Sequence, residues 1–328
     1  MQSQTKIRWG IIGLGNIAHK FATDLLTVED AQLYAVASRS RKTADEFSKK
    51  YNAIKAYGSY RELAEDKNVD AVYIATPHVF HKENTLMCLQ QGIPVLCEKP
   101  FAMNINEVEE MIALAMEKKV LLMEAMWTYF LPHYQHVLNI LQKKEYGNIL
   151  KIEADFGITP EYNPLSRTFN KALGGGSLLD IGIYPIFAAL STLGIPNKIE
   201  ASAKYFETGA DASCHIQFYY DKNVKATLNS SFVDNTPTTA TFYCEKATIK
   251  INRMFFLPTT VTIVTDKDEK TLDFGYKTLG YNYEAIHFNE LIRQGKKQSP
   301  IMSFDFSRKL ITLLDKVRSE IGLEYNLE

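Results

Sequence analysis

The stretch Ile7-Arg8-Trp9-Gly10-Ile11-Ile12-Gly13-Leu14-Gly15-Asn16-Ile17-Ala18 decides the fold. Its first half is an apolar run typical of a buried strand, and its second half has the pattern G-x-G-x-x-A before a helical repeat. The first glycine makes the tight turn, the second lets the backbone approach a pyrophosphate, and the alanine allows close helix-sheet packing. We therefore predict a dinucleotide-binding loop at the helix start, formed by Gly13, Leu14, Gly15, Asn16 and Ile17.

A second apolar strand, residues 32–37, ends in Ser38-Arg39-Ser40-Arg41-Lys42 without an acidic residue. An acid at this position would accept a hydrogen bond from a ribose 2′-hydroxyl, whereas a 2′-phosphate requires cations and hydroxyls. The pattern favours NADP, bound through Ser38, Arg39 and Lys42, and leaves NAD possible. The alternative is that these basic residues are only a solvated helix start.

Strand and helix patterns alternate six times within about the first 123 residues. This alternation predicts a doubly wound parallel sheet, a Rossmann domain, over residues 1–123, and a second domain over residues 124–328. The clearest further segments are strands at 69–75, 95–97 and 120–123 and helices at 42–51, 60–66, 82–91 and 104–118.

Polar groups follow two of these strands, where ligands bind at the carboxyl edge of a parallel sheet. Thr76, Pro77 and His81 follow one strand, and Glu98-Lys99-Pro100 follows the next. Pro100 disfavours a helical conformation for Lys99, so the lysine stays at the edge. We interpret Lys99 as catalytic, and Thr76, Pro77, His81, Glu98 and Lys99 itself as cofactor contacts. The alternative for the charged pair is a surface salt bridge, and the sequence leaves open whether the Lys99-Pro100 bond is cis.

Composition excludes several classes of function. The 328 residues include 37 Lys and Arg and 38 Asp and Glu, a net charge of -1 without blocks of like charge, so neither nucleic acid nor a membrane surface is an expected partner. The four cysteines lack a C-x-x-C spacing, and no apolar signal region begins the chain. We expect a cytoplasmic protein with reduced thiols and no membrane anchor.

Two H-x-x-H pairs, His78/His81 and His133/His136, are the nearest approach to a metal motif. No acid or cysteine completes a ligand set beside either pair. We therefore predict no metal.

From residue 148 the sequence pattern changes to short, β-rich segments separated by turns. Alternating residues such as those of 213–218 indicate a sheet with one face wet or covered by a partner. We predict an α+β domain with a large, open-faced, mostly antiparallel sheet, and a homodimer or homotetramer formed through it. The predicted strands are 148–156, 198–205, 212–220, 224–232, 238–243, 248–252, 260–264 and 270–274, followed by helices at 283–293 and 304–321.

Residues 174–185, Gly-Gly-Gly-Ser-Leu-Leu-Asp-Ile-Gly-Ile-Tyr-Pro, form the second informative stretch. Asp180 and Tyr184 are four residues apart and share one face if this segment is helical. Pro185 cannot donate to the carbonyl of Ile181, so a helix must kink there or begin after Ser177. We expect the shared face to meet Lys99; the alternative is a glycine-rich helix start with a capping aspartate.

Aromatic residues supply the expected substrate pocket. Trp127, at the domain junction, is expected to be a pocket wall and to contact the cofactor, because clefts between domains are lined by aromatic rings. Phe130 and Leu131 are expected in the core. Phe156 and Arg167 are further candidate substrate contacts, together with Asp180 and Tyr184.

With these motifs together, the chain resembles the Gfo/Idh/MocA family of glucose-fructose oxidoreductase and inositol dehydrogenase. The resemblance covers essentially the whole length and is strongest toward the branch of dimeric dihydrodiol dehydrogenase. It depends on G-x-G-x-x-A, Thr76-Pro77 with His81, Glu98-Lys99-Pro100, Glu124-Ala125-Met126-Trp127-Thr128, Asp155-Phe156-Gly157 and the glycine-rich stretch ending at Tyr184. Two positions depart from the pattern: Tyr129 stands where relatives often carry Arg, and His78 where T-P-N is expected.

The resemblance implies hydride transfer between NADP or NAD and a CH–OH or C=O carbon of a sugar, diol or dicarbonyl compound. It also implies that Lys99 and Tyr184 are the acid-base pair, with Asp180 in support. Two alternative functions use a bound dinucleotide without net oxidation of a substrate. One is a sugar sensor that binds the dinucleotide but catalyses no reaction, and the other is a redox-neutral enzyme that recycles bound NAD.

Overall fold

The computed structural model describes residues 5–325, which divide into two compact units. The first unit contains the chain up to Trp127 and then Thr278–Arg308, and the second contains Thr128–Lys277 and the chain from Lys309 onward. The sequence predicts a single boundary near residue 124, whereas this grouping places the first change of unit after Trp127 and returns Thr278–Arg308 to the first unit.

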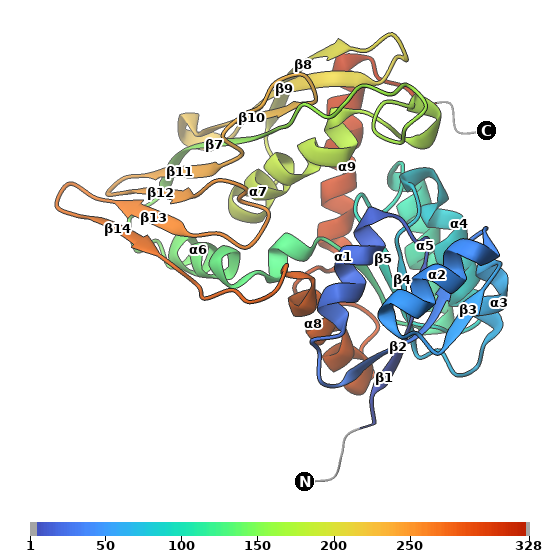
Figure 1. Ribbon diagram of the computed structural model, residues 1–328. Helices are drawn as coiled ribbons and strands as arrows, with labels where there is room; N and C mark the ends of the chain where they lie inside the picture. The colour runs from blue at the N-terminus through green and yellow to red at the C-terminus, as the bar shows by residue number, and fades with distance from the viewer. Residues whose placement is uncertain (1–4, 326–328) are drawn as a thin grey trace. The chain divides into compact units, whose positions relative to one another are not determined.

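A six-stranded parallel sheet is the centre of the first unit, with strand order β3-β2-β1-β4-β5-β6. Figure 1 labels β1 to β5 of this sheet. This order and the parallel pairing confirm the predicted Rossmann sheet. The short strand β3 was not among the predicted segments, because three partly exposed residues give no periodic pattern. The strands are β1 (Ile7–Ile12), β2 (Ala31–Ala37), β3 (Lys55–Tyr57), β4 (Ala71–Ile74), β5 (Val95–Glu98) and β6 (Leu122–Ala125).

Helices pack on this sheet in two groups: α4 lies against α3 and α5, whereas α1 lies against α8. Several begin at side-chain caps that the local sequence supplies. Ser40 accepts from the N–H of Thr43 at the start of α2, and Ser59 with Glu62 forms a capping box at α3. The helices are α1 (Asn16–Leu25), α2 (Arg41–Tyr51), α3 (Tyr60–Glu65), α4 (His81–Gln90), α5 (Ile105–Lys118) and α8 (Tyr281–Arg293), with a 3-10 turn η1 (His78–Phe80) before α4.

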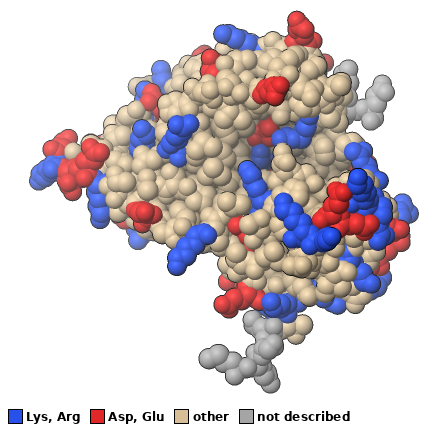
Figure 2. All heavy atoms as spheres, in the orientation of Figure 1, with Lys and Arg blue, Asp and Glu red and all other residues tan. Residues whose placement is uncertain are grey.

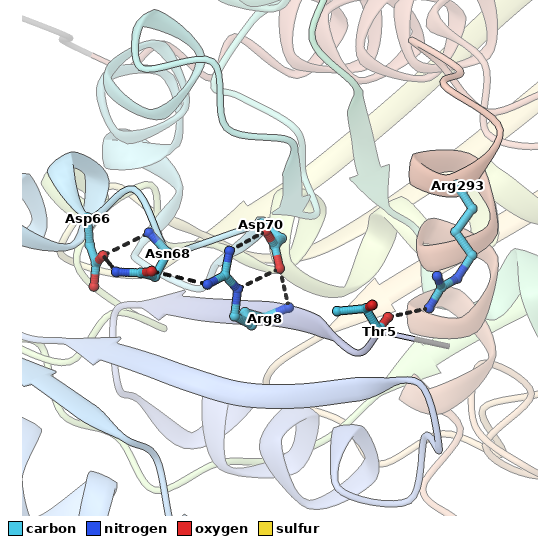
Figure 3. Close-up of polar contacts among 6 residues, drawn as sticks. All are labelled: Thr5, Arg8, Asp66, Asn68, Asp70 and Arg293. Carbon is cyan, nitrogen blue, oxygen red and sulfur yellow. Dashed lines mark hydrogen bonds and ion pairs between the residues drawn. The ribbon is translucent and has the colours of Figure 1, made fainter. Parts of the chain in front are cut away.

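Polar contacts tie α8 to the start of the sheet although 280 or more residues separate the partners in sequence. The indole of Trp9 donates to Asn289 at 3.0 Å. Arg293 donates to the carbonyl of Thr5 at 3.1 Å (Figure 3). In the same figure the guanidinium and backbone N–H of Arg8 both bind Asp70, with N and Nε each 2.9 Å from Oδ2. The contacts of Asn289 and Arg293 explain why α8 belongs to the first unit.

An eight-stranded sheet forms the second unit, in the order β14-β13-β12-β11-β7-β10-β9-β8. Only β7 and β10 pair in parallel, so the sheet is mostly antiparallel as predicted. Its strands are β7 (Ile149–Gly157), β8 (Lys198–Tyr205), β9 (Asp211–Tyr219), β10 (Lys225–Ser231), β11 (Ala240–Cys244), β12 (Thr248–Ile251), β13 (Val261–Val264) and β14 (Glu269–Leu272).

The two faces of this sheet differ. Helix α7 (Ile183–Leu193) packs on β7 and β10, and α6 (Pro132–Gln142), which was not predicted, packs on β12. Residues that alternate with the buried ones, including Glu153, His215 and Thr227, are partly or fully exposed. This alternation agrees with the predicted open face. The chain closes with α9 (Phe304–Ile321).

A π-helical segment, Leu178–Gly182, runs directly into α7. The change from π to α geometry occurs two residues before Pro185, which therefore falls in the first turn of α7, where a missing N–H costs least. The stretch Lys171–Leu193 is long and apolar enough to cross a membrane, with mean hydropathy 1.5 in its most apolar window. However, 89% of that window is buried within the structure, as in a core helix.

Charged side chains of both signs are interspersed over the face drawn in Figure 2. Over the whole sequence, positive and negative side chains nearly balance, with a net charge of -1.

Candidate active site

Gly13 and Gly15 form the predicted phosphate loop between β1 and α1. Gly13 has φ +86°, and a Cβ there would lie 2.8 Å from the backbone nitrogen of Thr76, so only glycine fits. A Cβ on Gly15 would meet no described atom within 4 Å, and no described side chain caps α1. The N–H groups at the start of this ten-residue helix can therefore donate hydrogen bonds to the oxygens of a phosphate. The loop fits a dinucleotide.

The end of β2 presents hydroxyls and cations near the surface. Ser38 Oγ accepts from the N–H of Ser40 at 3.2 Å, and the Arg39 guanidinium lies 5.9 Å from the ring centroid of Phe80. Lys42 is well exposed and lies 3.9 Å from Glu46, a weak pair. Contacts of these side chains with a 2′-phosphate remain a prediction.

The end of β4 is held by a buried histidine. His81 is 0% exposed, and its ring nitrogens lie 2.8 Å from the carbonyl oxygen of Pro100 and 2.9 Å from that of Thr76. This histidine thus joins the residue after β4 to the turn after β5. Direct contacts of Thr76, Pro77 and His81 with a cofactor remain predictions.

Lys99 lies on a turn whose backbone is fixed by two buried carboxyl groups. Glu98 Oε2 accepts from the Lys99 N–H at 3.1 Å, and Glu124 Oε1 accepts from the Phe101 N–H at 3.1 Å. Tyr73 donates its hydroxyl hydrogen to Glu98. The Lys99-Pro100 peptide bond is cis, which answers the question that the sequence left open.

Carboxyl groups gather in the interior beneath this turn. Burial is the main cause that raises the pKa of Glu124 to about 7. Glu284 on α8 is 0% exposed, and burial, followed by repulsion from Glu98 and Asp24, raises its pKa well above the usual range. Neither carboxyl oxygen of Glu284 has a hydrogen-bond partner among the described residues. Sequence reasoning missed Glu284, because a single acid in a helical pattern gives no sign of burial.

Trp127 is 1% exposed, and its ring stacks on Tyr281 with centroids 4.1 Å apart and planes at 9°. The structure therefore gives this ring a partner within the first unit. Its predicted contacts with cofactor and substrate remain proposals. Phe130 and Leu131 are both buried, in agreement with the expectation of core positions.

In the second unit, Tyr184 lies among aromatic rings. Its ring centroid is 5.8 Å from that of Phe156 and 4.8 Å from that of Phe256, and Phe156 stacks on Phe256 at 4.2 Å. Tyr184 and Phe156 are 4% and 5% exposed. The sequence did not single out Phe256, which comes from a loop between β12 and β13 without a motif.

Asp180 and Arg167 form a two-point ion pair. The two guanidinium nitrogens of Arg167 donate to the two carboxylate oxygens of Asp180 at 3.0 and 3.1 Å. The planar guanidinium matches the carboxylate, so the pair fixes the direction of Asp180. The two predicted substrate residues are thus brought together.

Asp211 on β9 anchors the segment that carries Asp180 and Tyr184. Its Oδ2 accepts from the Ser177 hydroxyl and the Leu178 N–H, both at 2.7 Å, at the start of the π-helical segment. Ser177 Oγ also lies 2.9 Å from Ser230 Oγ on β10. Asp211 was missed in the sequence because it lies in an alternating strand pattern, far from the glycine-rich stretch.

Lys99 belongs to the first unit, and Asp180 and Tyr184 belong to the second. Their action as an acid-base set is therefore a proposal. Within residues 5–325, no three His, Cys, Asp or Glu side chains are grouped so as to hold a metal ion.

Comparison with known proteins agrees with a Rossmann unit followed by a second, sheet-containing unit. A family described as an oxidoreductase family with an NAD-binding Rossmann fold matches residues 7–126, and the GFO/IDH/MocA C-terminal domain matches residues 134–250. The fold and its nucleotide loop are thus those of an NAD(P)-dependent oxidoreductase.

Relatives match along the whole chain. Trans-1,2-dihydrobenzene-1,2-diol dehydrogenase of Xenopus tropicalis is 36% identical over 97% of this chain and 99% of its own length. The mouse enzyme of the same name, from Mus musculus, is 37% identical over 97% and 98%. The structure of KijD10, a 3-ketoreductase from Actinomadura kijaniata in complex with NADP and TDP-benzene, has a TM-score of 0.88 at 26% identity, with 97% and 98% covered. The chain belongs to the GFO/IDH/MocA oxidoreductase family, which confirms the predicted family and class of enzyme.

Proposed function

We propose that this protein is an NADP-dependent dehydrogenase or reductase that interconverts a CH–OH group and a carbonyl group of a diol or sugar. The observation that carries this proposal is the likeness to trans-1,2-dihydrobenzene-1,2-diol dehydrogenases over 97% of the chain. The aromatic setting of Tyr184 supports a substrate with an apolar ring face, either a sugar or an aromatic diol.

NADP is favoured over NAD because Ser38, Arg39 and Lys42 follow β2 and no acid stands there. A 2′-phosphate pairs well with such cations and hydroxyls, whereas the 2′-hydroxyl of NAD has no carboxylate to bind. The NADP complex of the KijD10 structure supports the same choice.

Bound nicotinamide would accept or supply the hydride. Tyr184 gives or takes the hydroxyl proton of the substrate, and Lys99 holds the substrate oxygen. A cation beside a phenol favours its ionised form, which an isolated Tyr with a pKa of about 10 does not reach at neutral pH. Asp180, held by Arg167 on both oxygens, orients the group beside it.

Binding of NADPH and NADH, followed by fluorescence, tests the cofactor choice, and turnover on a panel of sugars, dicarbonyls and diols then tests the reaction. We expect tighter binding of NADPH and consumption of it by at least one substrate class. Tighter NADH binding would overturn the cofactor choice. Binding without turnover would indicate a sensor, and turnover without net NADPH consumption a redox-neutral enzyme.

Lys99→Met and Tyr184→Phe test the acid-base pair. Each should lower kcat by at least about a hundredfold, because general acid-base catalysis contributes on that order. Tyr184→Phe should leave the Kd of NADPH within about twofold, since Tyr184 lies outside the nucleotide-binding unit. Near-normal turnover in either variant would refute the assignment.

We further propose that the open face of the eight-stranded sheet joins copies of the chain into a homodimer or homotetramer. Exposed His215 and partly exposed Gln217, Thr227 and Asn229 form a polar surface there with paired hydrogen bonds. Sedimentation equilibrium decides between monomer, dimer and tetramer. A cytoplasmic location is proposed from the four buried cysteines, none of which forms a disulfide.

A further inference from the structure

His81 contacts two groups that can only accept hydrogen bonds. Its Nδ1 lies 2.8 Å from the carbonyl oxygen of Pro100, and its Nε2 lies 2.9 Å from the carbonyl oxygen of Thr76. A neutral imidazole carries one N–H and one lone pair, whereas an imidazolium carries two N–H groups. Two carbonyl partners at these distances therefore require the imidazolium form.

His133 in the second unit provides a contrast. Its Nε2 lies 3.0 Å from the carbonyl oxygen of Phe255, but its Nδ1 lies 2.6 Å from the hydroxyl of Tyr276. That hydroxyl accepts from the His133 backbone N–H and can donate to Nδ1, so a neutral ring satisfies every contact. Burial lowers the pKa of His133 to about 4, in agreement with a neutral ring.

The two carbonyls that His81 holds belong to the edge of the sheet where Lys99 lies. Thr76 follows β4, and Pro100 follows Lys99 directly. The neighbouring backbone groups are held by carboxyl groups, the Lys99 N–H by Glu98 and the Phe101 N–H by Glu124. Three successive residues of this turn are thus fixed by three buried side chains.

We propose that His81, as a buried imidazolium, is a positioning residue that holds the Lys99 turn in register with the end of β4. The proposal rests on the proposed function only for its consequence in catalysis. The titratable groups on the elements that these bonds join are, besides His81 itself, Lys82, Glu83 and Cys88 on α4, Tyr73 on β4, Cys97 and Glu98 on β5, Lys99 on the turn, His78 on η1 and Glu124 on β6. A buried cation requires opposite charge nearby, and Glu98, whose Oε2 accepts from the Lys99 N–H, is the carboxylate at this turn that can supply it.

Long-range ¹H–¹⁵N spectra of the histidine rings in the full chain test the charge state without any need for activity. At pH 7.5 we expect one ring with both nitrogens protonated, and we expect this signal to be absent from His81→Asn. His133 should show one protonated and one unprotonated nitrogen in the same spectrum. If His81→Asn does not fold, single His→Asn variants at the other six positions assign the signal by elimination. An unprotonated nitrogen on His81 at pH 7.5 would overturn the proposal.

Positioning of the turn has two readouts of its own. His81→Asn can reach only one of the two carbonyls, so amide hydrogen exchange at Phe101 should accelerate by at least about tenfold. The kcat on the best substrate should fall by at least about tenfold while its KM stays within about threefold, because misplacement of a catalytic group affects the transition state most.

His287→Asn is the matched control, because this histidine lies on α8, where its Nε2 is 2.8 Å from the Ser299 hydroxyl, and not on the turn that carries Lys99. It should leave both readouts unchanged. Unchanged exchange at Phe101 in His81→Asn would refute the positioning role. A wild-type chain that turns over no substrate would refute the proposed function, while the spectra and the exchange still decide the role of His81.

Discussion

At the scale of single residues, the notable feature is the set of carboxyl groups buried in the first unit. Glu98, Glu124 and Glu284 are 5%, 2% and 0% exposed. Burial disfavours a charged carboxylate, so each must be compensated by hydrogen bonds, by a nearby cation or by a proton. Glu98 and Glu124 accept backbone N–H bonds at the Lys99 turn, whereas Glu284 has no such compensation among the described residues.

Glu124→Gln should remove a pH dependence of stability. Because the folded-state pKa is raised from 4.5 to about 7, the folded protein binds the proton more tightly, and wild-type stability falls as pH rises through this window. The loss is up to about 3 kcal/mol, from about 1.4 kcal/mol for each pKa unit. Urea unfolding between pH 4.5 and 8 should show a smaller decline in the variant.

His133 makes the stability depend on pH in the opposite direction, so its contribution has to be separated from that of Glu124. Its pKa is lowered from 6.5 to about 4, so the unfolded chain binds the proton more tightly and stability falls as pH drops through that window. The difference between wild type and Glu124→Gln at each pH cancels this contribution. An unchanged difference from pH 4.5 to 8 would contradict the raised pKa of Glu124.

Glu284→Met should stabilise the protein at pH 8. The substitution replaces a buried carboxyl that has no hydrogen-bond partner within residues 5–325 by an apolar side chain of similar length, and it removes repulsion toward Glu98 and Asp24. We expect a gain of about 1 kcal/mol in the free energy of unfolding by urea denaturation. Glu290→Gln, on the exposed side of α8, is the control and should change stability by less than about 0.5 kcal/mol. A loss of stability in Glu284→Met would show that this carboxyl has a partner.

At the scale of the element, the segment Leu178–Gly182 and helix α7 decide how Asp180 and Tyr184 are presented. Asp211 fixes the start of the segment, and two glycines let it lie close to β9 and β10. A Cβ on Gly182 would lie 2.9 Å from Ser230 Oγ, and one on Gly176 would lie 2.0 Å from Asp211 Oδ1. The glycines thus permit close packing on the strands in addition to a flexible backbone.

Gly176→Ala should therefore lower the free energy of unfolding far more than an alanine substitution at another glycine with positive φ. Gly176 has φ +129° and no room for a Cβ, and we expect a loss of about 2–4 kcal/mol. Gly275→Ala is the matched variant: φ is +64°, but a Cβ there would meet none of the described atoms within 4 Å, so only backbone strain of about 1 kcal/mol applies. Thermal unfolding of the two variants gives the comparison. Equal losses would mean that the contact with Asp211 relaxes freely.

At the scale of the whole molecule, the nucleotide loop and the Lys99 turn belong to one unit, whereas Tyr184 and Asp180 belong to the other. Cofactor binding is thus expected to act first on the stability of the first unit. A ligand that binds only the folded state at a hundred times its Kd adds about 2.7 kcal/mol.

NADPH should raise the Tm of the wild-type protein more than NADH does at equal concentration. The reason is the basic end of β2, where Arg39 and Lys42 favour the additional phosphate. Differential scanning calorimetry with increasing concentrations of each cofactor gives the two shifts. In Arg39→Ala the difference between the cofactors should shrink; a difference that persists unchanged would place the 2′-phosphate elsewhere.

The sequence by itself determined the Rossmann sheet apart from β3, the eight strands of the second sheet and the glycine loop Gly13–Ile17. These features depend on local signals: apolar periodicity, glycine where no Cβ fits, and turns between alternating strands. The same signals placed Lys99 at a sheet edge, because strand β5 ends there.

Only the tertiary structure decided what lies around these residues. It added the return of α8 to the first unit, the two carbonyls held by His81, the buried Glu284 and the anchoring of the π-helical segment by Asp211. Each of these depends on contacts between residues far apart in the chain, such as Leu178 with Asp211. Burial and hydrogen-bond partners across such separations leave no periodic signal in the sequence, because they arise only when distant segments pack together.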